Sequence, residues 1–525
     1  MKAIRVIFIV LICVMLVIPV LTSDFSKTYS PLETRPLTGF PKTHKANGDI
    51  NYDFFKQYGN RFADHIGMRD QMIGLYSEIM VNGFGLSSSP KIEFGKDGWM
   101  FYTNENNIDI GTGKFMFNDA ELKLIADNQQ AISDYYKSIG KEYVLIFTPG
   151  KASVYTEYVF GNYEVCETII DQVTDYLLEN TDVKVINVKD AELEAKDKGQ
   201  LFLKTDTHWT QLGTYYAYLD IVDKLNNFGL DIGTPVVPEF EPLEVAGEFS
   251  HMLGKNGVLK PEKVYNAVWD TATEQFTDDG DPAIKAITDF NSNVTYMAAN
   301  TQQPVLFRNT EAQSDLKVLT YVDSMWRPDR GLPKYLSENF SEIVYTRMRT
   351  IDTAVDELYD ADVVIWSMTE RFIHTLAGMP CRLPSPSEDN YDELIASYTY
   401  KEYPKFDTWT GRHGFSLNSE NAQGIPISTI SDGALCKLRG WAVDFTENTA
   451  ADDVYIRVGG RTFKALYGME SDGVVNTFGY EAMRYCVFEA NIPAEYFKPG
   501  ETISFIMVNR KTGTTYTPAE YTLAE

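Results

Sequence analysis

The sequence LKVLTYVDS, residues 316–324, decides the fold class of this 525-residue chain. Its first seven residues form a short and mostly apolar run with several β-branched side chains, which is typical of a buried strand. The run ends in Asp323 and Ser324, so the predicted strand leads directly into a polar turn. In open α/β sheets, ligands bind at the carboxyl ends of strands. The stretch therefore predicts a strand whose end carries a candidate nucleophile, Ser324.

Similar runs recur along the chain and alternate with helical patterns. Further strands are expected at 142–148, 183–188, 342–346 and 362–366, with helices at 120–139, 163–180 and 211–228. This alternation indicates a parallel sheet with helices on both faces. Residues 96–98, Lys-Asp-Gly between two apolar runs, indicate a hairpin. We expect an α/β domain over about 51–400, with a polar, irregular insertion at about 235–312 that covers or borders the site.

The composition changes after about residue 403. Short β-type runs recur between turn signals such as Gly459-Gly460 and Pro499-Gly500, a pattern typical of an all-β sandwich. We expect residues 405–525 to form this sandwich, with carbohydrate binding as a candidate role. The aromatic residues that would stack on sugar rings are Trp409, Trp441, Tyr467, Phe478 and Tyr480. Aromatic residues in a sandwich more often belong to its core.

The N-terminus combines basic residues with an apolar run. Lys2 and Arg5 precede an apolar stretch from Val6 to Leu21, whose length lies between that of a signal-peptide core and that of a full membrane span. Residues 1–23 are expected to be a membrane anchor or a cleaved signal segment, and residues 24–50 a tether. Both alternatives place the rest of the chain outside the cytoplasm, because the basic residues stay inside.

Charge and cysteine content exclude several function classes. With 47 Lys and Arg against 74 Asp and Glu, the formal net charge is −27, which argues against nucleic-acid binding through a basic surface. The five cysteines form no CxxC pair and no Cys/His cluster at zinc spacing, and no nucleotide motif is present, so we predict no metal and no cofactor. Cys436 and Cys486 could form a disulfide; two buried thiols are an equal alternative.

A single histidine has a carboxylate two residues before it. In the sequence TDTHWT, residues 205–210, Asp206 and His208 fall on the same side of an extended segment. The carboxylate can then fix the imidazole tautomer and make His208 a general base. Ser324 at a strand end would supply the nucleophile. An Asp-Ser pair alone is usually a helix cap, but the joint placement favours a Ser–His–Asp set.

Six segments resemble, in order, the motifs of the DHHW proteins, relatives of the alginate O-acetyltransferases AlgJ and AlgX with an SGNH hydrolase-like domain. They are FADHIGMRD (62–70), FGKDGWMFY (94–102), TPGKASVY (148–155), DTHWT with Gly213, VDSM (322–325), and the strand at 362–369 followed by Glu370-Arg371. The resemblance covers about residues 35–375. One position departs from it: the family's glycine before the Asp-Ser pair is Val322 here.

The resemblance implies an SGNH hydrolase-like fold and an extracytoplasmic O-acetyltransferase that acts on a cell-surface or secreted polysaccharide through an acetyl-serine. Ser324 would be the nucleophile, His208 the base and Asp206 its orienter, with acetyl supplied by a membrane-bound O-acyltransferase partner. The amides of Ser324 and Gly150 are candidate oxyanion donors.

Three more residues near predicted strand ends are candidate substrate-binding groups: Lys151, Tyr155 and Arg371. The alternative is that Lys151 is a solvated loop residue, that Tyr155 packs, and that Arg371 forms a structural pair. Two other functions also stay open, a carbohydrate acetyl esterase with the same triad and a non-catalytic polysaccharide-binding or assembly protein.

Overall fold

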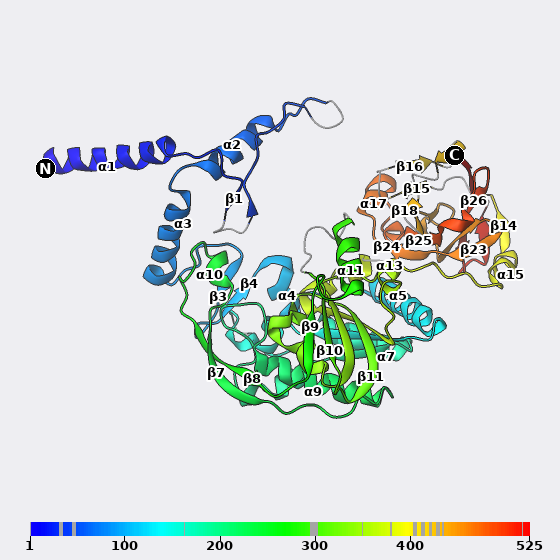
Figure 1. Cartoon of the computed structure of the whole chain (residues 1–525). Coiled ribbons are helices and arrows are strands. Elements are labelled where there is room, and N and C mark those ends of the chain that lie inside the picture. Colours follow the sequence, from blue (N-terminus) through cyan, green and yellow to red (C-terminus); the bar gives the residue numbers. More distant parts are fainter. Residues whose placement is uncertain are drawn as a thin grey trace.

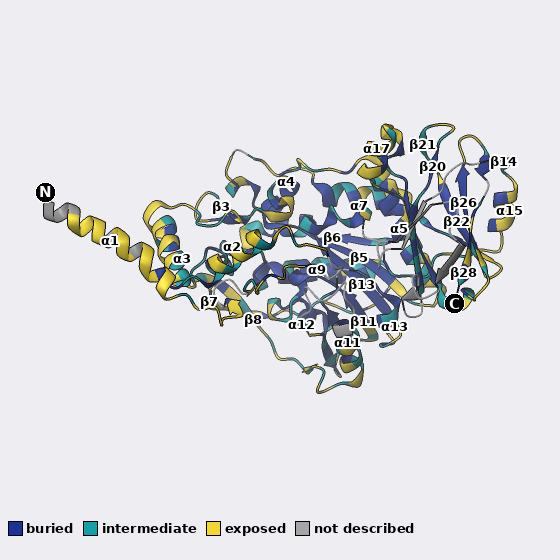
Figure 2. Ribbon diagram, turned by 90° about the horizontal axis from the view of Figure 1, so that it is seen from above, coloured by how far each residue is buried: buried dark blue, intermediate teal, exposed yellow. Residues whose placement is uncertain are grey.

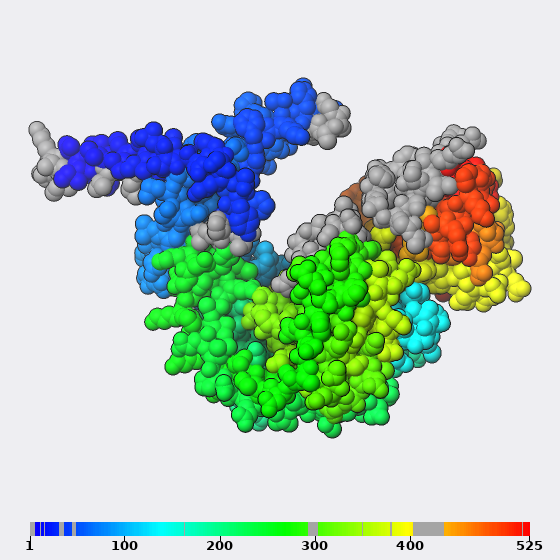
Figure 3. Space-filling model, viewed as in Figure 1, coloured from blue at the N-terminus to red at the C-terminus, as the bar shows by residue number. Residues whose placement is uncertain are grey.

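The computed structural model has an α/β body between a group of N-terminal helices and a strand-rich C-terminal region (Figure 1). It describes all residues except 1, 31–34, 45–48, 162, 294–302, 349, 379–380, 403–406, 411–414, 419–422, 427–430, 433–434, 517 and 525. The N-terminal helices project from the body on the side opposite the C-terminal region (Figure 3).

A seven-stranded sheet, counted over the described residues, forms the centre of the body in the order β6-β5-β13-β11-β12-β10-β9. The bounds are β5 Glu142–Thr148, β6 Lys184–Asn187, β9 Thr273–Phe276, β10 Val305–Asn309, β11 Ser314–Tyr321, β12 Phe340–Thr346 and β13 Val363–Thr369. The five predicted strands are confirmed, and they pair in parallel. The prediction of a parallel sheet is wrong at one edge, because β10 and β9 join it antiparallel.

Two apolar cores lie on the two faces of this sheet. Alternate side chains of β5 enter different cores: Val144 and Ile146 pack on the side of α9 (Gln211–Asn227), and Leu145 and Phe147 on the side of α5 (Asp119–Ser138) and α7 (Ile169–Asn180). Figure 2 shows these strands as buried, with helices over them. The predicted helix at 163–180 begins later, at Ile169, because Thr168 and Asp171 form a capping box there.

The remaining helices are shorter or lie outside the sheet. Their bounds are α1 Lys2–Leu21, α2 Phe54–His65, α3 Arg69–Glu78, α4 Asn107–Gly111, α6 Lys151–Val154, α8 Lys189–Glu194, α10 Phe249–Met252, α11 Pro282–Asn293, α12 Leu332–Leu336, α13 Thr353–Asp356, α14 Glu370–Ile373, α15 Tyr391–Ala396 and α17 Asp472–Phe478.

Two hairpins lie beside the site. The predicted turn at 96–98 joins β3 (Ile92–Phe94) to β4 (Met100–Tyr102), and Asp97 and Gly98 have the positive φ of 52° and 79° that this tight turn needs. The segment predicted as irregular contains a second hairpin, of β7 (Glu239–Val245) and β8 (Glu262–Val268). Its β7 strand is mostly exposed, so it has no apolar alternation to reveal it in the sequence.

Over its described residues, the C-terminal region contains two large sheets that share one core, consistent with the expected sandwich. One sheet has the order β14-β27-β26-β22-β23, with β28 and β17 attached; the other has the order β16-β15-β19-β25-β24, with β18 attached. The bounds are β14 Thr399–Lys401, β15 Asp407–Thr410, β16 Phe415–Asn418, β17 Gln423–Pro426, β18 Ser431–Asp432, β19 Leu435–Trp441, β22 Asp453–Val458, β23 Arg461–Lys464, β24 Leu466–Met469, β25 Val487–Pro493, β26 Thr502–Asn509, β27 Thr514–Tyr516 and β28 Ala519–Ala524. Leu438 and Phe488 of one sheet pack with Phe505 of the other.

Most of the candidate sugar-stacking aromatics have structural contacts instead. Trp441 packs against Phe478 with ring centroids 5.6 Å apart, and the Tyr467 hydroxyl donates to the carbonyl of Ala442 at 2.5 Å. Tyr480 is 46% exposed. The side chain of Trp409 lies outside the described residues.

Cys436 and Cys486 are buried and form no disulfide, so the disulfide prediction is wrong and the alternative of two buried thiols is correct. Since no disulfide then constrains the unfolded chain, we expect a reducing agent to leave the Tm of the protein unchanged. Thermal unfolding with and without dithiothreitol measures this. A drop in Tm under reducing conditions would show that these cysteines pair.

The N-terminal segment forms helix α1, whose described apolar side chains are mostly exposed. None of the helices formed by the described residues combines the length and the apolar character of a membrane span. The described part of the expected tether packs against α2: His65 Nε2 lies 2.9 Å from the carbonyl of Lys27, and Thr38 donates its amide to Asp64 at 2.9 Å.

Candidate active site

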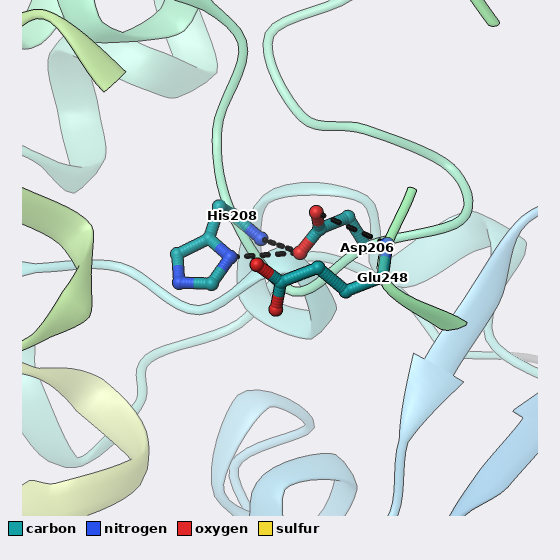
Figure 4. Close-up of side chains that lie close together, drawn as sticks. All are labelled: Asp206, His208 and Glu248. Atoms are coloured by element: carbon teal, nitrogen blue, oxygen red, sulfur yellow. Dashed lines mark hydrogen bonds and ion pairs between the residues drawn. The ribbon is translucent and has the colours of Figure 1, made fainter. Parts of the chain in front are cut away.

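Asp206 and His208 form a buried pair on the turn that follows α8. His208 Nδ1 lies 2.7 Å from Asp206 Oδ1, and both side chains are almost fully buried. The Oδ1 atom also accepts the backbone N–H groups of Thr207 and His208, at 2.6 and 3.2 Å. Figure 4 shows that the second ring nitrogen, Nε2, faces away from the carboxylate. This Nε2 atom is buried and has no hydrogen-bond partner among the described residues, so it is free to accept a proton.

The charge of Asp206 is stabilised by its neighbours. Burial alone would raise the pKa of this carboxyl, but the hydrogen bond from His208 and the charges of His208, Arg330 and Lys151 outweigh it and hold the pKa well below its usual value. Asp206 is therefore ionised at neutral pH. An ionised carboxylate at Nδ1 is the arrangement that orients an imidazole as a base.

Ser324 lies where β11 ends, at the start of a short 3-10 turn, Ser324–Trp326. The carboxylate of Asp323 fixes this turn: Oδ1 accepts the Met325 amide at 2.9 Å and Oδ2 accepts the Thr369 amide at 2.6 Å. The predicted polar turn is therefore present as a 3-10 turn. Asp323 thus caps the turn and also ties it to the end of the neighbouring strand β13.

Two contacts bring the Ser324 segment to the Asp206–His208 pair. The indole Nε1 of Trp209 donates to the carbonyl of Met325 at 2.9 Å. Arg330 Nη2 lies 3.0 Å from Asp206 Oδ2. The residues next to His208 and next to Ser324 are therefore hydrogen-bonded to each other, and the two contacts join the segments that carry them.

Val322, the departure from the family pattern, is fully buried in the core on the α9 side. Its amide donates to the carbonyl of Thr346 at 3.3 Å, which extends the pairing of β11 with β12. The larger side chain is therefore accommodated by the core.

Arg371 lies beside the candidate nucleophile. Its Nη2 atom is 3.5 Å from Ser324 Oγ, and its Nε atom is 3.5 Å from Glu105 Oε2. The preceding residue, Glu370, binds the start of α6. Its buried Oε2 accepts the Gly150 amide at 2.8 Å and the Ser153 hydroxyl at 2.5 Å. The prediction that the Gly150 amide stabilises an oxyanion is therefore wrong: that donor is already used by Glu370.

Lys151 and Tyr155 do not reach a substrate. The ammonium of Lys151 is buried and donates to the carbonyls of Leu203, Lys204 and Asp206 at 3.0, 3.0 and 2.6 Å. The Tyr155 ring stacks on Trp99 with centroids 4.1 Å apart, and its hydroxyl accepts the Leu201 amide. Their predicted substrate-binding role is wrong, as is the alternative of a solvated Lys151. Both residues support the backbone that carries the Asp206–His208 pair.

Four charged residues around the pair were missed by sequence reasoning: Glu248, Glu262, Arg327 and Arg330. Glu262, at the start of β8, accepts the amides of Lys204 and Thr205 at 2.7 Å each. Glu248 follows β7, and its amide lies 3.4 Å from Asp206 Oδ2. Both acids belong to the segment expected to border the site, but their contacts join residues far apart in sequence and have no local motif.

Asp206, His208 and Glu248 offer donor atoms within 4.8 Å of one another, which are ligand types that metals use. Arginines already neutralise the two carboxylates, however: Arg330 binds Asp206, and Arg327 Nη1 lies 2.5 Å from Glu248 Oε1. The donor set therefore fits an ion-pair network better than a cation site.

The central sheet, its two helical layers and the serine at a strand end define an SGNH hydrolase-like α/β domain. Residues 92–281 match the family model described as an SGNH hydrolase-like domain of the acetyltransferase AlgX. This part of the chain is therefore similar to the SGNH hydrolase-like domain of AlgX.

Two relatives of known sequence are both named "Probable alginate O-acetylase AlgJ". The protein of Pseudomonas putida is 30% identical over 151 residues, which are 28% of this chain and 37% of the relative. The protein of Pseudomonas syringae is 31% identical over 134 residues, 24% of this chain and 32% of the relative. The chain thus aligns with about a third of the length of these relatives.

Two solved structures are also similar. The O-acetyltransferase domain of Pseudomonas putida AlgJ has 18% identity and a TM-score of 0.37, over 55% of this chain and 93% of that chain. A DHHW family protein from Eubacterium siraeum has 17% identity and a TM-score of 0.34, over 48% of this chain and 86% of that chain.

Proposed function

We propose that this chain is a serine-dependent O-acetyltransferase that acetylates hydroxyl groups of a cell-surface or secreted polysaccharide outside the cytoplasm. One observation carries the proposal: His208 is held by an ionised Asp206, keeps Nε2 without a partner among the described residues, and belongs to a segment that is hydrogen-bonded to the segment of Ser324 at a strand end. The alginate O-acetylase names of the aligned relatives support O-acetyl transfer to a polysaccharide as the reaction.

In the first half-reaction, His208 Nε2 takes the hydroxyl proton of Ser324, and Oγ attacks the carbonyl carbon of an acetyl donor. The Ser324 amide lies at the start of its turn, where backbone N–H groups have no acceptor within the helix, and it would donate to the oxyanion. The guanidinium of Arg371, beside Oγ, adds a positive charge there. The leaving group then takes the proton from His208, and an acetyl-serine remains.

In the second half-reaction, a sugar hydroxyl gives its proton to His208 and attacks the acetyl-serine. Collapse of the tetrahedral intermediate forms the sugar ester, and Ser324 Oγ regains the proton. The steps need no metal and no organic cofactor. In the esterase alternative, water attacks in place of the sugar, so the two functions differ only in what reaches the acetyl-serine.

The partners follow from the same proposal. The acceptor is the polysaccharide, and a membrane-bound O-acyltransferase supplies the acetyl group. The basic and apolar N-terminal segment, residues 1–23, would bring the chain to the membrane where such a supplier acts.

A test uses the full chain with a chromogenic acetyl ester, with and without neutral or uronate oligosaccharides. We expect acetylated oligosaccharide in the products and, after rapid quenching, an acetyl group on the peptide that contains Ser324. Because Ser324→Ala lacks the nucleophile, it should give neither product nor label. Ester hydrolysis without any acetylated sugar would favour the esterase, and full activity of Ser324→Ala would refute the proposal.

A further inference from the structure

The segment that follows Ser324 returns to the Asp206–His208 pair and covers it with charge. Arg330, with a side chain only 12% exposed, lies 3.0 Å from Asp206 Oδ2 and 3.8 Å from Glu248 Oε1. Arg327, in the same segment, binds Glu248 and Asp329. His208 uses one oxygen of Asp206, and Arg330 uses the other. A general base and the carboxylate that orients it need only the His208–Asp206 bond, so these additional ion pairs call for another role.

We propose that Arg330 and Glu248 are positioning residues that set the pH range over which His208 accepts the proton of Ser324. The inference rests on the proposed function, because it assigns these residues a role in the same reaction. Neither residue contacts the reacting atoms. Both act through Asp206 and through the imidazole that this carboxylate orients.

The direction of each effect follows from charge. A carboxylate beside Nδ1 stabilises the protonated imidazole, and a guanidinium on its second oxygen weakens that stabilisation. Arg330 therefore favours the neutral imidazole, the form that acts as a base. Glu248, whose carboxylate lies within 4.8 Å of the donor atoms of Asp206 and His208, favours the protonated form. The two residues should shift the pH range in opposite directions.

The other charged groups around Asp206 do not cancel these two. Lys151 faces it from α6 through the backbone carbonyl, Arg327 neutralises part of the charge of Glu248, and Glu262 binds the preceding turn. Arg330 is the cation whose side chain contacts the Asp206 carboxylate among the described residues. At this short distance and depth, opposite charges interact strongly, because solvent screening is weak.

Arg330 also has a geometric role. It lies in the segment that begins with Ser324, so its bond to Asp206 joins the nucleophile segment to the base. Arg330→Lys keeps the positive charge but lacks the planar fork that can bind two carboxylates at once. Arg330→Lys should therefore keep the pH range close to that of the wild type, while the rate of reaction at Ser324 falls.

The test measures the rate at which an arylsulfonyl fluoride inactivates the full chain between about pH 5 and 9. Sulfonylation of Ser324 needs His208 as base but no acetyl donor and no sugar. We expect Arg330→Gln to move the acid side of this profile up by roughly one pH unit, and Glu248→Gln to move it down. Arg330→Lys should lie near the wild type. The control is Arg308→Gln. It removes an arginine of β10 that pairs with Glu342 and Asp281, and it should leave the pH profile unchanged.

Each outcome bears on one of the two proposals. Suppose that Ser324 is labelled, but the pH profiles of Arg330→Gln and Glu248→Gln are unchanged or shift in the same direction. This result would overturn the inference and leave the proposed function standing. A wild type that is never labelled at Ser324 would overturn the proposed function, and the inference with it. Opposite shifts, with rescue by Arg330→Lys, would support both, since a general loss of stability does not change sign with the charge removed.

Discussion

Replacing His208 by alanine is expected to lower kcat/KM for acetyl transfer by roughly 10⁴-fold or more. Asp206 lies 2.7 Å from this imidazole and orients it, and in the proposed mechanism the Nε2 atom accepts the proton of Ser324. Without it, the serine hydroxyl is a weak nucleophile at neutral pH. Initial rates with an acetyl ester and an oligosaccharide acceptor measure the loss. Asp206→Asn should cost nearly as much, because an amide can stabilise the wrong tautomer.

The matched control is His44→Ala, in the N-terminal segment outside the α/β body. His44 is exposed, and its Nδ1 lies 3.1 Å from Oγ1 of the neighbouring Thr43. Its loss should leave kcat/KM within about twofold, since surface substitutions away from the site have small effects. Activity of His208→Ala close to that of His44→Ala would mean that another group is the base.

The strands of the body could be predicted because each one carries its own signal. The run at 143–147 is apolar along its length, since both of its faces are buried in the sheet, and so is the run at 363–366. The edge strand β9 was missed because it is partly exposed and carries no apolar pattern, and its neighbour β10 because only residues 305–307 of its five residues are apolar. Local sequence therefore identified the strands with longer apolar runs and failed at this end of the sheet.

The candidate site shows the same division. Asp206 and His208 are two residues apart, so their contact follows from strand geometry. Ser324 could be placed because it follows a recognisable strand. The roles of Gly150 and Lys151 could not be inferred, because their partners, Glu370 and three carbonyls of the 203–206 turn, are distant in sequence. Residue type indicates what a side chain can do; only the fold determines which neighbour already uses it.

Replacing Lys151 by methionine should both destabilise the fold and disable the site. The substitution keeps much of the side-chain volume but leaves the carbonyls of Leu203, Lys204 and Asp206 without their donor. Unsatisfied buried acceptors cost about 1–3 kcal/mol each, and the removal of a buried charge offsets part of this, so we expect a net loss of about 2–4 kcal/mol. The freed turn carries Asp206 and His208, and a small displacement there should lower kcat/KM by roughly 100-fold.

Urea unfolding and initial rates, measured in parallel, separate the two effects. Lys204→Met is the matched control, because the ammonium of Lys204 is near the surface, where it donates to the carbonyl of Asp97 and lies 5.5 Å from the centroid of the Trp99 ring. It should lose well under about 1 kcal/mol. A Lys151→Met protein with wild-type stability and activity would show that the three carbonyls find water instead, and that the lysine does not support the turn.

The pH dependence of stability gives a further check on Lys151. Burial lowers the pKa of Lys151 from 10.5 to about 7. Between these pH values the unfolded chain keeps a proton that the folded protein has released, so the free energy of unfolding of the wild type should rise with pH relative to Lys151→Met. Below about pH 7 both states hold the proton, and the difference between the two proteins should be constant. A difference that stays flat from pH 7 to pH 10 would mean that the three carbonyls keep the buried ammonium charged.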